Sequence, residues 1–144
     1  MEKLAFGYNC DHGFDDDSRA SDGFGWFYVS AKENGKPCRA RFWADRSRMN
    51  AFATAILNQA KSARFPLETH WDDEQDGRAF HLTISECVTS ADLKVHLRVD
   101  RCGTRGGEVL CCAFTTSKIG LRTFNDAMTD MINQRCAKAT LSGW

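Results

Sequence analysis

The sequence lacks any apolar run that approaches the roughly 20 residues of a membrane-spanning helix. Residues 1–10 also lack the apolar stretch of a secretory signal peptide, because they carry Glu2, Lys3 and Asn9. Neither sign of charge is in excess, since 19 Lys and Arg residues balance 19 Asp and Glu residues. Strong non-specific binding to nucleic acid needs a surplus of Lys and Arg. The composition therefore predicts a cytoplasmic protein with no membrane and no nucleic-acid partner.

Cys-x-x-Cys pairs are absent, although the chain has seven cysteines. An odd number leaves at least one thiol outside any complete set of disulfides, and with no signal peptide we expect reduced thiols. Cys111 and Cys112 are adjacent in an apolar strand, so they should point to opposite faces and fill the core. No cysteine is predicted at a helix N-terminus, where the helix dipole would lower its pKa, so no catalytic cysteine is predicted.

Zinc-ligand spacings are missing too, because the chain has no His-x-x-x-His pair. His81 and His96 are predicted on the wet face of a sheet, with His70 on a strand nearby in sequence, and we interpret all three as exposed side chains. The segment Gly103–Gly107 matches neither a phosphate loop nor a dinucleotide fingerprint, and is interpreted as a turn. The sequence predicts no metal and no cofactor.

Calcium-binding patterns are incomplete in both acidic segments. The loop Asp11–Asp22 lacks the alternating spacing that places several carboxylates around one ion. The segment Asp72–Gly77 comes closer to that spacing, but Thr83 stands where the pattern needs a glutamate. Both segments are interpreted as solvated polar loops.

Seven segments carry the alternation or the aromatic and β-branched content of strands. In Ala91–Asp100 the apolar residues Leu93, Val95, Leu97 and Val99 alternate with polar ones, which predicts one buried and one wet face. An Asn-Gly pair within Glu33–Lys36 predicts a hairpin turn. The predicted strands are Leu4–Tyr8, Phe24–Ala31, Pro37–Ala44, Leu67–Trp71, Arg78–Cys87, Ala91–Asp100 and Glu108–Thr115.

Two helices are predicted from apolar stripes of helical spacing. Asp45 or Ser47 can cap the first, which should stop before Pro66, and Thr116 or Ser117 can cap the second. The first stripe is Met49, Phe52, Ala53, Ile56, Leu57 and Ala60. The second stripe is Leu121, Phe124, Met128, Met131, Ile132 and Arg135 or Cys136.

The order of these elements over residues 1–144 is three strands, a helix, four strands and a second helix. Short connections favour antiparallel neighbours, and amphipathic helices must cover an apolar sheet face. The sequence thus predicts a single α+β domain of two layers, with one mainly antiparallel sheet and two helices packed on one face. The residues expected to be buried are Leu82, Ile84, Leu93, Val95, Leu97, Ile56, Leu57, Phe124 and Met128.

An aromatic cluster and an acidic loop are the candidate binding features. Most of the aromatic residues between Phe24 and Trp43 should be core, but Trp26 and Tyr28 would form an exposed patch if they face away from the helices. Trp, Tyr and Arg are the usual anchors of protein interfaces. Five carboxylates on the Asp11–Asp22 loop, including those of Asp15, Asp16 and Asp17, could face a basic surface on a partner.

The segment 41–131 resembles a group of bacterial immunity proteins from polymorphic-toxin systems, of the wall-associated-toxin type. The similar features are a strand ending at Phe42-Trp43, the helix that follows it, a strand closing on Trp71, and a strand running into a helix at Phe114-Thr115-Thr116. This resemblance implies a protein that neutralises a toxin by binding it. The neutral net charge departs from the acidic balance common among immunity proteins that neutralise nucleases.

The sequence contains no motif that an enzyme would need, so the leading hypothesis is a non-catalytic module that sequesters a protein partner. The candidate binding residues are Asp15, Asp16, Asp17, Trp26 and Tyr28. A small enzyme or a small-ligand domain that uses the open sheet face is the alternative. A homodimer joined through sheet edges or the aromatic patch is the third hypothesis.

Overall fold

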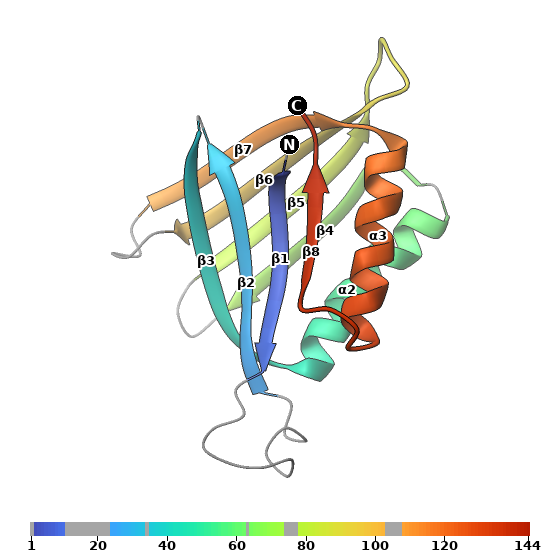
Figure 1. The fold of residues 1–144 in the computed structure, drawn as a ribbon. Helices are drawn as coiled ribbons and strands as arrows, with labels where there is room; N and C mark the ends of the chain where they lie inside the picture. The colour runs from blue at the N-terminus through green and yellow to red at the C-terminus, as the bar shows by residue number, and fades with distance from the viewer. Residues whose placement is uncertain (1, 11–23, 34, 63, 74–77, 103–107) are drawn as a thin grey trace.

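The computed structural model describes residues 2–10, 24–33, 35–62, 64–73, 78–102 and 108–144. These residues form two four-stranded antiparallel sheets and two helices, so the predicted α+β class is confirmed (Figure 1). The first sheet, in the order β3-β2-β1-β8, contains β1 (Glu2–Cys10), β2 (Phe24–Glu33), β3 (Lys36–Asp45) and β8 (Lys138–Ser142). The second, in the order β4-β5-β6-β7, contains β4 (Leu67–Asp73), β5 (Arg78–Glu86), β6 (Leu93–Cys102) and β7 (Glu108–Thr116).

The prediction of a single sheet is wrong, because helix α2 (Arg46–Lys61) separates β3 from β4 and a second sheet begins after it. The inner faces of the two sheets share one core. The rings of Phe6 in β1 and Phe80 in β5 have centroids 5.6 Å apart, and Phe27 in β2 stacks on Trp71 in β4 at 4.6 Å. Two facing sheets bury both apolar faces against each other, which a single meander cannot do.

Helices α2 and α3 (Lys118–Ile132) lie on the same side of the sheets, next to β4 and β8 (Figure 1). Phe52 of α2 and Phe124 of α3 both contact the ring of Phe6, at centroid distances of 5.4 and 5.9 Å. Both helices therefore reach the inner face of the first sheet. Their buried residues recur at helical spacing, as the sequence predicts.

The helix starts follow the predicted capping residues. The Asp45 carboxylate accepts a hydrogen bond from the Arg48 backbone N–H at 2.7 Å, and the Ser117 hydroxyl accepts one from that of Gly120 at 2.9 Å. Each cap satisfies a backbone donor that the helix itself leaves unpaired. At its other end, α3 is shorter than the predicted stripe and stops before Cys136.

Strand β8 was not predicted, and it completes the first sheet. It pairs antiparallel with β1, and its residues Ala139 and Leu141 are buried. Just beyond it, the backbone of Trp144 exchanges two hydrogen bonds of 2.9 Å with that of Thr115 in β7. This end of the chain therefore joins the two sheets. Five residues are too few for an alternating pattern to be recognised in the sequence alone.

The predicted core residues are buried with one exception. Leu57 is only partly buried, while the other eight, on β5, β6 and the two helices, are buried. In β6 the side chains of Lys94, His96 and Arg98 are exposed, so alternation along this strand separates core from solvent as predicted.

Of the two adjacent cysteines, only Cys112 lies in the core. Its side chain is 6% exposed, and its thiol donates to the Lys32 carbonyl at 3.2 Å. Cys111 points to the opposite face and is exposed, so the prediction that both are buried is wrong for this residue. The outer face of the second sheet is solvated, and one of two adjacent strand residues must lie on it.

We expect alkylation to distinguish these two thiols. In the native protein an alkylating reagent should label Cys111 and Cys136 quickly and Cys112 only after denaturation, because a buried thiol is shielded from the reagent. Fragment mass spectrometry of the labelled peptides measures the order. Equal native labelling at positions 111 and 112 would contradict the assigned faces. A denatured, unreduced protein without free thiols would contradict the reduced state.

Candidate functional site

Trp26 and Tyr28, the two aromatic residues singled out in the sequence, lie side by side on the outer face of the first sheet. Their neighbours Phe27 and Val29 point inward and are buried, whereas Trp26 and Tyr28 themselves are partly exposed. The structure therefore selects the exposed alternative over the core one. The acidic residues Asp15, Asp16 and Asp17, like residues 74–77 and 103–107, lie outside the described residues.

Strand β3 adds three side chains to the same face. Trp43 pairs with Trp26 across the strands and meets it edge to face, with ring centroids 5.0 Å apart. The Arg41 guanidinium lies 4.3 Å from the centroid of Trp26, and that of Arg39 lies 4.9 Å from the centroid of Tyr28. We call these five residues the aromatic–arginine surface.

Arg39, Arg41 and Trp43 were missed as binding candidates. All three are exposed, Trp43 to 43%, whereas the alternating residues of β3, Ala40, Phe42 and Ala44, are buried. The alternation of small or apolar residues with Arg39, Arg41 and Trp43 in β3 therefore indicates which side chains face outward. It becomes a binding signal only when the strand partner places Trp26 and Tyr28 beside it.

Gly7 of β1 leaves room for the ring of Tyr28. The two residues pair directly, and a Cβ atom at position 7 would come within 2.1 Å of the Tyr28 ring. Any larger residue at this position must push the ring away. The glycine thus lets the aromatic side chain lie flat across the neighbouring strand.

We expect Gly7→Ala to change the aromatic–arginine surface without unfolding the protein. The added methyl group displaces the end of a partly exposed side chain, so the free energy of unfolding should change by less than about 1 kcal/mol. The Tyr28 ring should lose its contact with Arg39, visible as altered ring and guanidinium NMR shifts. Unchanged shifts at residues 28 and 39 would contradict this close packing.

Chemically, the aromatic–arginine surface is suited to binding. Trp, Tyr and Arg carry most of the binding energy in protein interfaces. A guanidinium over an aromatic ring adds about 0.5–1 kcal/mol at exposed sites and holds a long side chain in one orientation. The surface combines broad apolar area with two positive charges.

The outer face of the second sheet is a separate polar surface. It presents His70, His81 and His96, as the sequence predicts for the latter two, and a hollow of about 320 Å³ lies between His81, His96 and Cys111. The Arg98 guanidinium next to it donates to Asp100 at 3.0 Å. That hydrogen bond, followed by the charge of the carboxylate, raises the pKa of Arg98 above its ordinary value.

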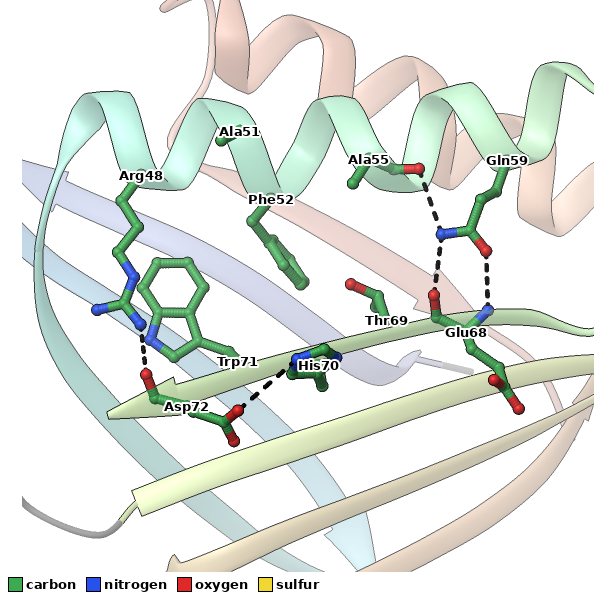
Figure 2. A pocket seen from close by; sticks show the side chains of 10 residues that line it. All are labelled: Arg48, Ala51, Phe52, Ala55, Gln59, Glu68, Thr69, His70, Trp71 and Asp72. Atoms are coloured by element: carbon green, nitrogen blue, oxygen red, sulfur yellow. Dashed lines mark hydrogen bonds and ion pairs between the residues drawn. The ribbon is translucent and has the colours of Figure 1, made fainter. Parts of the chain in front are cut away.

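A groove of about 510 Å³ runs between α2 and the edge strand β4 (Figure 2). The Gln59 amide spans it, since its nitrogen donates to the Glu68 carbonyl at 2.9 Å and its oxygen accepts from the Glu68 N–H at 3.0 Å. Arg48 donates to the Asp72 carbonyl at the other end. These side chains form hydrogen bonds with backbone N–H and C=O groups of an edge strand. Without such partners, these groups could pair with a strand of another chain.

Neither helix in the described part of the chain has the length and apolar content needed to cross a membrane. Among the same residues, no group of three or more His, Cys, Asp or Glu side chains forms a metal centre. No protein-family model matches the chain, and no curated protein sequence matches it significantly.

Proposed function

We propose that this protein is a non-catalytic binding protein that sequesters a protein partner on its aromatic–arginine surface. The observation that carries the proposal is the outward placement of three large aromatic side chains and two arginines on adjacent strands. Alternate residues of β2 and β3 fill the core, so these strands already have an apolar face that stabilises the fold. The outer aromatic residues lie on the opposite face from this core, where a partner can reach them.

The partner is expected to be a protein that offers apolar side chains and carboxylates. Apolar groups match the indole and phenol rings, and carboxylates match the two guanidinium groups, which form strong charge-assisted hydrogen bonds with them. The resemblance of segment 41–131 to immunity proteins adds that this partner is a toxin. Asp15, Asp16 and Asp17 are the proposed second contact, on a basic region of the same partner.

Affinity capture from a native lysate tests the proposal, with the product of any adjacent toxin-like gene co-expressed. The wild-type protein should retain a partner that a Trp26→Ala, Trp43→Ala double variant does not retain. An Ile119→Ala variant, which removes an exposed apolar side chain on α3, should retain it equally. If the captured protein is a toxin, its expression alone should arrest growth, and co-expression of the wild-type chain should restore growth.

Three results would contradict the proposal. Equal capture by the wild-type and double-variant proteins would move the partner to another surface. Capture of nucleic acid alone would make the rings and arginines a stacking platform for bases. A homodimer that the double variant abolishes, with no other partner, would assign the surface to self-association.

A second candidate, binding or conversion of a small ligand, is favoured by the hollow on the second sheet. Its lining includes His81, His96 and Cys111, which are the residue types that acid–base or nucleophilic chemistry uses. Turnover of a small molecule by the wild-type chain, lost on replacement of one of these residues, would favour this candidate. Full retention of partner binding by the same variant would separate the two functions.

A further inference from the structure

His70 and His81 are directly opposite each other on the outer face of β4 and β5. The backbone N–H and C=O of Glu68 both bond to the Gln59 side chain, so these two groups point to the open edge of β4 and not toward β5. The direction of these backbone groups alternates from one residue to the next along a strand. Those of His70, two residues after Glu68, therefore point to the same edge. The two histidines therefore form a non-hydrogen-bonded pair, the kind in which opposite side chains come closest, with Cα atoms about 4.5 Å apart.

The imidazole rings of this pair have the separation that a shared metal ion requires. Their centroids are 5.4 Å apart and their planes are inclined by 58°. Two imidazoles on one tetrahedral Zn²⁺, each with a Zn–N bond of about 2.0–2.1 Å, have centroids about 5.2 Å apart. Because both side chains are exposed, rotation about their χ angles can turn one nitrogen of each ring toward a shared ion at this separation.

Asp72 is close enough to orient one of the rings after a small rotation of its exposed side chain. Its Oδ2 atom is 3.7 Å from Nε2 of His70, and both side chains are well exposed (Figure 2). A histidine that binds a metal through one nitrogen usually donates its other N–H to a carboxylate or carbonyl, which fixes the tautomer and ring direction. Here the carboxylate lies beside Nε2, so Nδ1 of His70 is the nitrogen left for a metal.

The surrounding charges favour a cation. Glu68 and Asp72 are exposed on the same face of β4. Two arginines lie nearby: Arg98 pairs with His81 across β5 and β6 and is hydrogen-bonded to Asp100 at 3.0 Å, and Arg48 donates to the Asp72 carbonyl. The carboxylate of Asp100 partly offsets the positive charge of Arg98, and the carbonyl of Asp72 binds the guanidinium of Arg48.

We propose that His70 and His81 form a two-histidine site for a divalent late transition metal ion such as Zn²⁺ or Ni²⁺, with Asp72 orienting His70. The described residues supply no third protein ligand, so water completes the coordination and the site stays open to solvent. Imidazole nitrogen selects these metals over Mg²⁺ and Ca²⁺, which prefer oxygen ligands. The bound ion joins edge strand β4 to β5, beside the groove under α2.

Metal titration of the full-length protein tests the site, with thermal unfolding and calorimetry as readouts. Zn²⁺ and Ni²⁺ should each raise the melting temperature with saturation near one equivalent, because an ion that binds only the folded state stabilises it. Mg²⁺ at the same concentration should have no effect. His70→Ala and His81→Ala should each abolish the saturable shift, and Asp72→Asn should weaken affinity by about 10–100-fold.

Two variants on the same face serve as matched controls. His96→Ala and Cys111→Ser remove an exposed histidine and an exposed thiol near the pair, and both should bind Zn²⁺ like the wild type. Loss of binding in either control, wild-type binding in His70→Ala, or no shift with Zn²⁺ and Ni²⁺ would overturn the proposal. All five substituted positions are exposed, so the variants should fold.

Discussion

Replacement of Leu97 by alanine is expected to lower the free energy of unfolding by about 2–5 kcal/mol. The side chain is 2% exposed on β6, a central strand whose neighbours across the sheet are Leu82 in β5 and Cys112 in β7. Truncation removes buried methyl groups and leaves a cavity in the core that the two sheets share. Denaturant unfolding, monitored by circular dichroism, measures the loss.

Lys94→Ala is the matched control on the same strand. Its side chain is exposed on the outer face, so the free energy of unfolding should change by no more than about 0.5 kcal/mol. A loss below about 1 kcal/mol for Leu97→Ala would contradict the assignment of the inward face of β6. A large loss for both variants would mean that both faces of the sheet are buried.

Truncation of Trp26 is expected to weaken partner binding by about 2 kcal/mol or more, roughly thirtyfold in affinity. The indole contacts Trp43 on one side and the Arg41 guanidinium on another, so its loss also releases two neighbouring side chains. The change should appear mainly as faster dissociation, because short-range packing governs residence time. Surface plasmon resonance with the captured partner measures both rate constants.

Replacing Asp15, Asp16 and Asp17 together by asparagine gives a contrasting kinetic result. These carboxylates should mainly accelerate association through long-range attraction, so their loss should slow association and reduce its dependence on salt. Ile119→Ala should leave both rate constants unchanged, since this exposed side chain lies on α3. Unaltered dissociation in Trp26→Ala would contradict its role as an anchor.

Local patterns in the sequence determined most of the secondary structure. Alternation fixed β5 and β6, helical stripes fixed α2 and the body of α3, and the capping side chains of Asp45 and Ser117 fixed the two helix starts. The hairpin at Gly35, whose φ is +80°, also followed from its residues. Such features depend on contacts within a few residues, so the sequence contains the physical cause in full.

The candidate sites could be predicted only in part, because they depend on pairing between distant strands. The sequence places Trp26 and Tyr28 on the same face of their strand. The two-residue period of a strand does not say which of its two faces is buried in the core. The roles of Arg39 and Arg41 depend on the register between β2 and β3, and the meeting of His70 with His81 on that between β4 and β5. Neither pairing has a signature in either segment alone.

The tertiary structure alone decided that there are two sheets and where their outer faces lie. Strand β8 pairs with β1, from which it is separated by almost the whole chain. Phe6 of the first sheet packs against Phe80 of the second. The alternation along these strands would be the same if they belonged to a single sheet. The sequence by itself determined which residues are apolar and how often they recur. Which apolar faces bury one another depends on the free energy of the whole packed core, and that choice left the aromatic–arginine surface exposed.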